Sequence, residues 1–221
     1  MEFLTSEEAT ERTRIILRGS VLLWLGALTA WLIRADAALL QQFDTRPFFI
    51  SLRPVFEWYC DWGMFIFYAF FIALLVFGRR YKRPLFTQAG LAYVYAQLFG
   101  TFLLIRLIKF GCGRPRPHVA TVHDALCQAR SLAHAFNSLR SSHAVNVAVG
   151  AMFVFLLLRS RVAALFALSA ALFMALARIA IGEHYLSDVL AGLAFGVAIA
   201  AVVMRVYLLP RWRAIETAAT Q

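Results

Sequence analysis

The stretch Val189–Met204, VLAGLAFGVAIAAVVM, runs for sixteen residues without a charged side chain. A helix that crosses the hydrocarbon core of a membrane needs about 20 predominantly apolar residues. Lipid cannot hydrogen-bond to an open backbone, so an apolar segment at membrane depth has to be helical. The stretch therefore predicts a membrane-spanning helix, which can be extended as far as Leu209.

The rest of the chain is also rich in apolar residues and poor in charged ones. Of its 221 residues, 62% are hydrophobic and only 15% are charged, and the mean hydropathy is +0.70. Soluble domains usually carry about 25% charged residues. The sequence predicts an all-α, polytopic membrane protein with six transmembrane helices, and we expect residues 1–221 to form one membrane-embedded domain. The five further spans are predicted at Ser20–Ile33, Trp62–Gly78, Leu85–Ile105, Ser141–Leu158 and Val162–Ala177.

Basic residues lie on both sides of these predicted helices. With six spans, one side receives the amino end, the four cations of the loop Gly78–Pro84, the turn Arg159-Ser160-Arg161, and the carboxyl tail. Short loops rich in Lys and Arg stay in the cytoplasm, so this side is predicted to be cytoplasmic. The opposite side is also basic, against that rule, and an anionic substrate would explain its charge. It receives Asp36–Asp61, Lys109–Arg140 and Arg178–Asp188.

The net charge of +10 indicates an anionic partner, which could be nucleic acid or lipid. The basic residues are separated by apolar runs and do not gather along one soluble face, as they would in a nucleic-acid-binding domain. Anionic lipid head groups are the expected partners, and nucleic acid is not.

Three elements on the outer side combine cations with hydroxyl and imidazole groups. Each lies at the end of a predicted helix and on the same predicted face, so we expect them to converge at the membrane surface. They are Lys109 followed after six residues by Arg116-Pro117, the run Arg140-Ser141-Ser142-His143, and Arg178 followed by His184 and Asp188.

These residue types suit the binding of a phosphate ester. Lys109, Arg116 and Arg178 can balance the charge of the phosphate, and arginine can grip it in bidentate fashion. Ser141 and Ser142 stand at a predicted helix start, where free N–H groups and the helix dipole favour an anion. Two more cations are candidates for contact with a second anionic group of the substrate, namely Arg114 and Arg140.

The same elements supply a nucleophile and an acid. His184 and Asp188 are four residues apart and share a helical face if the last span starts early. A carboxylate that binds one imidazole nitrogen leaves the other free to attack. His143 is then available to protonate the leaving oxygen. No metal site is predicted, because the loop histidines His118, His123 and His134 are too scattered to bind zinc.

The three motifs resemble the signatures of the type 2 phosphatidic acid phosphatase superfamily, which also includes bacterial acid phosphatases and vanadium haloperoxidases. Those signatures read Lys-x6-Arg-Pro, Pro-Ser-Gly-His and Ser-Arg-x5-His-x3-Asp, and the chain matches them in order and spacing. It departs from them at three positions, with Arg140 for proline, Ser142 for glycine and Ala177 for serine.

This resemblance implies a lipid phosphate phosphatase that works without a metal or another cofactor. In the implied mechanism, His184 forms a phosphohistidine, Asp188 orients His184, and His143 protonates the lipid alkoxide. The lipids that the family suggests are phosphatidic acid, phosphatidylglycerophosphate, undecaprenyl diphosphate and the phosphates of lipid A. The expected location is the bacterial inner membrane, with a multi-pass chain and the active site facing the periplasm.

Other interpretations stay open at this point. The phosphohistidine could pass its phosphoryl group to a second lipid, which would make the protein a lipid-to-lipid phosphotransferase. A binding or transport protein would explain the cations but not the His–Asp pairing, and haloperoxidase chemistry does not need so much lipid-embedded chain. Cys112 and Cys127 either form a disulfide or remain free thiols.

Overall fold

The computed structural model describes residues 2–33, 35–104, 106–107, 114–117 and 141–220. Within these ranges the chain is almost entirely helical, and strand-like pairing is limited to isolated bridge residues, among them the pair Phe3 and Leu158. The predicted all-α class is confirmed. The helices are α1 (Ser6–Leu32), α2 (Ala35–Thr45), α3 (Pro47–Trp62), α4 (Phe65–Arg80), α5 (Pro84–Tyr95), the π-helix η1 (Ala96–Leu104), α7 (Ser142–Leu157), α8 (Arg161–Ala180), α9 (Leu186–Val203), the π-helix η3 (Met204–Leu208) and α10 (Leu209–Ala219).

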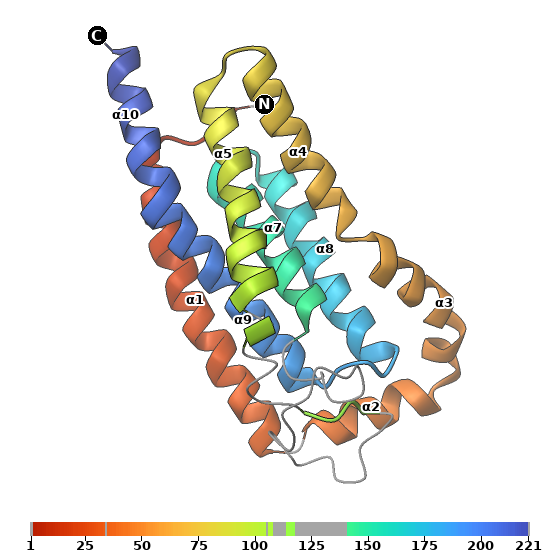
Figure 1. Ribbon diagram of the computed structural model, residues 1–221. Coiled ribbons are helices and arrows are strands. Elements are labelled where there is room, and N and C mark those ends of the chain that lie inside the picture. Colours follow the sequence, from red (N-terminus) through yellow and green to blue (C-terminus); the bar gives the residue numbers. More distant parts are fainter. Residues whose placement is uncertain (1, 34, 105, 108–113, 118–140, 221) are drawn as a thin grey trace.

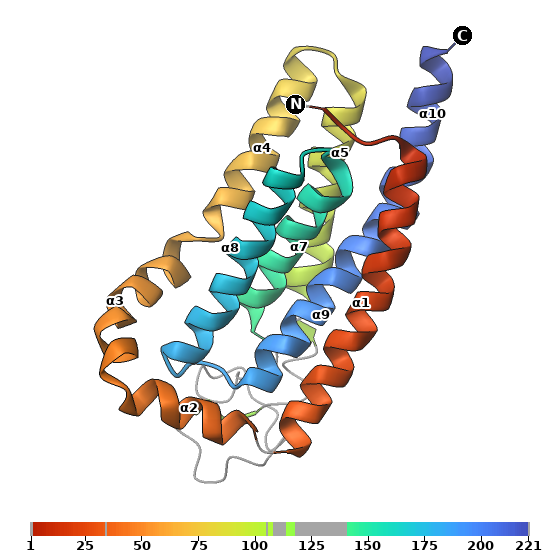
Figure 2. The same ribbon diagram turned by 180° about the vertical axis from the view of Figure 1, so that it is seen from behind.

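The helices form an elongated bundle in which α1, α4, α5, α7, α8 and α9 run roughly parallel to one another (Figures 1 and 2). α7 lies inside this bundle and contacts helices on several sides, including α1, α4, α5, α8 and α9. Its residues are apolar all around and mostly buried, as expected of a helix enclosed by others. α2 and α3 turn across one end of the bundle (Figure 1).

The outside of the bundle is apolar. Large side chains such as Leu22, Phe166 and Val206 are exposed on the outer helices, and a belt of this kind would be costly in water. Among the described residues, four helical stretches are long and apolar enough to cross a membrane, and α7 is apolar but shorter. The polytopic membrane class is confirmed, whereas the number of six spans stays a prediction. The four stretches are Ser6–Leu32, Pro47–Arg80, Arg161–Ala180 and Leu186–Ala219.

Two glycines on α9 let it cross α7 at backbone contact. A Cβ added at Gly192 would lie 2.9 Å from the carbonyl oxygen of Ser141, and one at Gly196 would lie 2.6 Å from that of Val145. Small residues four apart are a common solution for close helix packing in membranes. The crossing places the first turn of α7 against the first turn of α9, and the Ser141 N–H donates to the Asp188 carbonyl at 3.4 Å.

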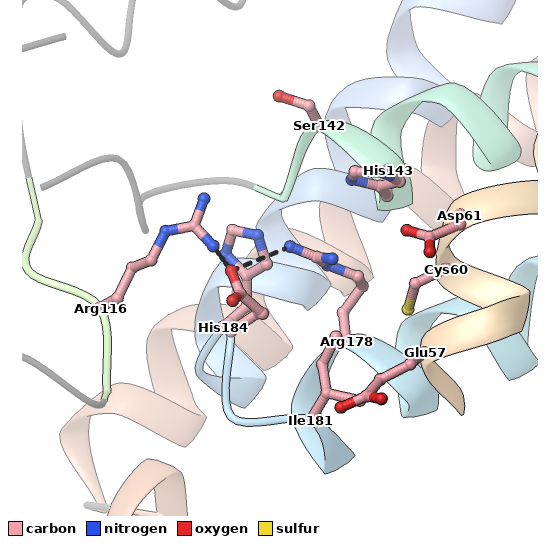
Figure 3. A pocket seen from close by; sticks show the side chains of 10 residues that line it. Glu57, Cys60, Asp61, Arg116, Ser142, His143, Arg178, Ile181 and His184 are labelled. Carbon is pink, nitrogen blue, oxygen red and sulfur yellow. Dashed lines mark hydrogen bonds and ion pairs between the residues drawn. The ribbon is translucent and has the colours of Figure 1, made fainter. Parts of the chain in front are cut away.

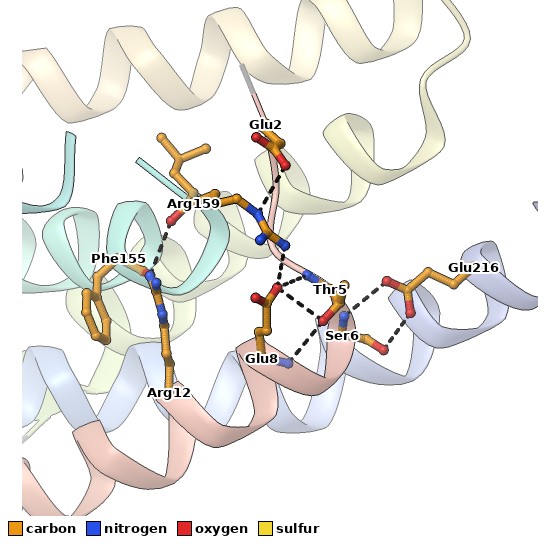
Figure 4. Close-up of polar contacts among 9 residues, drawn as sticks. Glu2, Thr5, Ser6, Glu8, Arg12, Phe155, Arg159 and Glu216 are labelled. Carbon is orange, nitrogen blue, oxygen red and sulfur yellow. Dashed lines mark hydrogen bonds and ion pairs between the residues drawn. The ribbon is translucent and has the colours of Figure 1, made fainter. Parts of the chain in front are cut away.

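Polar contacts tie the chain ends together at the opposite end of the bundle (Figure 4). Arg159 pairs with Glu2 at 3.1 Å and with Glu8 at 2.9 Å. Arg12 donates to the Phe155 carbonyl at 2.6 Å, which satisfies an otherwise open carbonyl near the end of α7. Ser6 donates to the Glu216 carboxylate from the carboxyl tail. The basic segments predicted to share one side of the membrane therefore lie together at this end.

Candidate active site

The end of the bundle that carries the predicted motifs contains a cavity of about 500 Å³ (Figure 3). Residues from all three predicted motifs line it, which brings the motifs together as expected. Lys109 and Arg140, and likewise Cys112 and Cys127, lie outside the described residues. The lining residues are Arg116, Ser142, His143, Arg178 and His184, together with Glu57, Cys60, Asp61, Ile181 and Glu183.

The two serines at the start of α7 have different positions. Ser141 is the N-cap of α7, and its hydroxyl accepts the Ala144 N–H at 3.4 Å. Its side chain is fully buried and makes a capping contact, and its predicted contact with phosphate stays a prediction. Ser142 is the first residue of α7 and lines the cavity. The cavity thus meets a helix N-terminus, where the dipole favours an anion.

The link between α8 and α9 brings His184 into the cavity. Gly182 adopts a φ of +74°, which glycine accommodates easily, and the His184 N–H then donates to the Arg178 carbonyl at 3.2 Å. α9 begins only at Leu186, so the early helix start on which the predicted shared face of His184 and Asp188 depends is not found. The reason is that the Asp188 carboxylate caps the helix by accepting the Tyr185 N–H at 3.3 Å. His184 and Asp188 are both buried all the same.

Two buried arginines face the cavity from different elements, Arg116 from residues 114–117 and Arg178 from the end of α8 (Figure 3). Burial, together with the positive charge of Arg178, lowers the pKa of Arg116 to about 10, so it remains a cation at neutral pH. The Glu183 carboxylate forms ion pairs with both guanidinium groups, and its Oε2 lies 3.4 Å from Nη2 of Arg178. An anionic group of the protein thus occupies the place between these two cations.

Arg114 does not line the cavity, and its predicted contact with the substrate stays a prediction. Its side chain is 1% exposed and binds two carboxylates, Asp188 at 2.7 Å and Asp36 at 3.0 Å. Its guanidinium carbon also lies 4.0 Å from the centre of the Tyr185 ring. Burial alone would lower the pKa of Arg114, but the two carboxylates outweigh it and raise that pKa. Arg114 therefore joins the 114–117 segment to α2 and α9.

Sequence reasoning missed the role of Asp36 and the helix α3 in this site, although it placed Glu57 and Asp61 on the outer side as possible head-group contacts. Asp36 gives α2 a role in the core of the site, because it also accepts the backbone N–H of Ser187 at 2.8 Å. α3 supplies one wall of the cavity through Glu57, Cys60 and Asp61 (Figure 3). An acidic residue next to a predicted span was the only sequence signal for Asp36, and α3 belongs to no signature motif.

Comparison with known proteins indicates the family of the chain. Residues 86–212 match the family model described as the PAP2 superfamily. The lipid A 1-phosphatase of Rhizobium johnstonii is 35% identical over 125 residues, which cover 56% of this chain and 50% of the relative. The lipid A 1-phosphatase of Rhizobium etli is 34% identical over 125 residues, 56% of this chain and 53% of the relative. The chain thus spans about half the length of the curated relatives it matches.

A solved structure shows the same fold. It is the transmembrane PAP2-type phosphatidylglycerolphosphate phosphatase of Bacillus subtilis, with a TM-score of 0.56 and 20% identity. The match covers 88% of this chain and 94% of that chain. The family model, the ordered motifs and this shared fold agree, and they confirm the resemblance to the type 2 phosphatidic acid phosphatases. The chain belongs to the PAP2 superfamily.

Proposed function

We propose that this protein is an integral membrane phosphatase that removes a phosphate from a lipid head group. The observation that carries the proposal is a single cavity, at one end of an apolar bundle, lined by two histidines and two buried arginines. Two relatives named lipid A 1-phosphatase favour the phosphate of a glycolipid such as lipid A as the substrate.

In the proposed reaction, His184 attacks phosphorus and the bond from phosphorus to the lipid oxygen breaks. His143 gives its proton to the leaving lipid alkoxide, which leaves a phosphohistidine at His184. His143 then takes a proton from water as the water attacks phosphorus, the phosphorus–nitrogen bond to His184 breaks, and inorganic phosphate is released with His184 restored as the free imidazole. Asp188, held by Arg114, orients His184. Arg116 and Arg178 stabilise the charge that develops on the equatorial oxygens, a task that Lys109 shares by its place in the motif.

The proposal is tested by phosphate release from purified protein in detergent, with lipid A, phosphatidylglycerophosphate, undecaprenyl diphosphate and phosphatidic acid as substrates. We expect release from at least one lipid, undiminished by EDTA because arginines balance the phosphate charge, and blocked by vanadate. Release that depends on an added divalent cation would contradict the metal-independent mechanism. Transfer of label to a second lipid without free phosphate would favour the phosphotransferase.

Glu183 should compete with the substrate for its cations. Replacing Glu183 with Gln removes the carboxylate between Arg116 and Arg178, so we expect tighter inhibition by vanadate and a lower KM for the lipid phosphate. A partly exposed ion pair contributes up to about 1 kcal/mol, which corresponds to roughly a 5-fold change at most. The matched control is Glu57→Gln, since Glu57 lines the cavity but pairs with Arg53 at 3.2 Å. Weaker vanadate inhibition in Glu183→Gln would show that Glu183 holds the arginines in place instead.

We further propose that the site faces the periplasm from the inner membrane, because the basic segments cluster at the other end of the bundle. Single cysteines at two exposed positions test this in a variant whose native cysteines are replaced: Thr45 at the site end and Tyr81 at the opposite end. In intact spheroplasts, an impermeant maleimide should label the cysteine at position 45 and should reach position 81 only after lysis. The reverse pattern would place the site in the cytoplasm.

A further inference from the structure

A second cavity of about 500 Å³ adjoins the candidate active site. It lies between α4, the continuous helix formed by α5 and η1, and the first turns of α7. Ser142 lines both cavities, so the two sites are neighbours across the start of α7. Its other lining residues are Tyr68, Ile72, Tyr93, Val94, Gln97, Leu98, Thr101, Phe102, Arg106 and Asn146.

By hydrogen-bond geometry, three buried oxygens in this cavity lack a partner within the described part of the chain: Tyr93 Oη, Gln97 Oε1 and Thr101 Oγ1. The Tyr93 hydroxyl and the Gln97 side chain are nevertheless close enough to interact with each other. Their residues are spaced by four, so they follow one another along one side of the helix. A buried polar atom without a partner is costly, and lipid supplies none. A row of three such atoms in a mostly apolar helix calls for a partner that the described residues do not supply.

The surrounding structure fixes these groups in place. The Tyr93 ring stacks on Phe71 with centroids 4.1 Å apart and lies edge-on to Phe153. Gln97 Nε2 donates to the Asn146 carbonyl at 3.3 Å, which leaves Oε1 as its open atom. Thr101 lies in η1, and π-helical turns of this kind are frequent at functional sites. The open oxygens therefore belong to positioned side chains.

We infer that this cavity, hereafter the hydroxyl subsite, binds an uncharged hydrogen-bonding part of the lipid head group next to its phosphate. The inference rests on the proposed function and specifies its substrate class. Gln97 Oε1 can only accept, so its partner must carry an O–H or N–H, and the Tyr93 and Thr101 hydroxyls can donate or accept. A sugar with hydroxyl or amide groups meets these needs, whereas a polyprenyl chain offers no donor.

The walls of the hydroxyl subsite also suit a sugar. Ile72, Leu98 and Phe102 provide apolar surface for the faces of a sugar ring or the first carbons of an acyl chain. Arg106, also in the lining, is held with its guanidinium carbon 4.5 Å from the centre of the Phe102 ring. A phosphate at Ser142 and His143 and a sugar against Tyr93 would fill both cavities with one molecule.

Isosteric variants test the subsite because they remove only the open oxygens. Tyr93→Phe and Thr101→Val should each lower kcat/KM for a phosphorylated N-acylglucosamine lipid roughly 2- to 12-fold, the effect of one neutral hydrogen bond. They should leave kcat/KM for dodecyl phosphate, which has no donor beyond its phosphate, unchanged. Tyr95→Phe is the matched control, since Tyr95 lies on another side of the same helix against Phe99 and Tyr207.

Thermal stability separates the possible outcomes. Loss of an unpartnered buried oxygen should leave the unfolding midpoint of the ligand-free protein unchanged or raise it. A lower midpoint with equal losses on both lipids would mean that the hydroxyls are structural, and unchanged kinetics on the sugar lipid would mean that only water fills the cavity. Either result overturns the subsite. If the wild-type protein releases phosphate from neither lipid nor from any other tested lipid, the proposed function fails, and the subsite with it.

Discussion

Alanine at His184 or at His143 should reduce phosphate release at least about 100-fold, because each removes a group that acts on the reacting atoms. The two histidines reach the cavity from different elements, His184 from the α8–α9 link and His143 from the first turn of α7. Their proposed roles differ, so the two variants should respond differently to the leaving group.

The leaving group distinguishes the nucleophile from the acid. A lipid aryl phosphate leaves as a phenolate that needs little protonation, so His143→Ala should regain much of its activity on this substrate and His184→Ala should not. Rapid quenching of radiolabelled substrate should trap acid-labile phosphate on His143→Ala protein and none on His184→Ala protein. Glu57→Gln, a change in the same cavity outside the proposed chemistry, serves as the control for folding. Near-normal turnover by His184→Ala would refute the phosphohistidine mechanism.

The sequence predicted the bundle well because hydropathy in lipid is a strong constraint. It underestimated the lengths of several helices, since helices continue beyond their apolar part. α1 starts at Ser6, fourteen residues before the predicted span, because Thr5 and Glu8 form a capping box with bonds of 2.8 and 3.2 Å. The segment Asp36–Asp61 contains most of α2 and α3, helices that are too short or too mixed in polarity to stand out as separate spans.

The sequence predicted the site residues that belong to motifs with fixed spacing. It did not predict the contacts that depend on how distant helices pack. Histidines and arginines at fixed spacings converge on the cavity as expected, in the case of His143, Arg116 and Arg178. Arg114 belongs to the same stretch, yet its neighbours in space are Asp36 and Asp188, 78 and 74 residues away along the chain. A local sequence pattern cannot distinguish an arginine that binds substrate from one that pairs with a distant carboxylate. The carboxylates of Asp36 and Asp188 come together only because α2 packs on α9.

The second large effect is expected from Arg114→Met, which should strongly destabilise the protein and abolish phosphate release. Arg114, Asp36 and Asp188 are all buried, so the change leaves two carboxylates in the interior without their cation. Removing one partner of a buried ion pair costs about 3–5 kcal/mol, a large part of the 5–15 kcal/mol that typically separates folded from unfolded states. The control is Arg14→Met, which breaks only an exposed pair with Glu11 and should change little.

Partial replacements show whether Arg114 acts through Asp188. Arg114→Lys keeps the charge but cannot bridge two carboxylates as a guanidinium does, so we expect intermediate stability and low activity. Adding Asp36→Asn to Arg114→Met removes one of the two uncompensated charges. This double variant should recover part of the unfolding midpoint without recovering activity, because Asp188 still lacks its bond of 2.7 Å to Arg114. If Arg114→Met instead unfolds like the wild type and loses activity only on doubly anionic lipids, then Arg114 contacts substrate after all, and its pairing with Asp36 and Asp188 is not what holds the site.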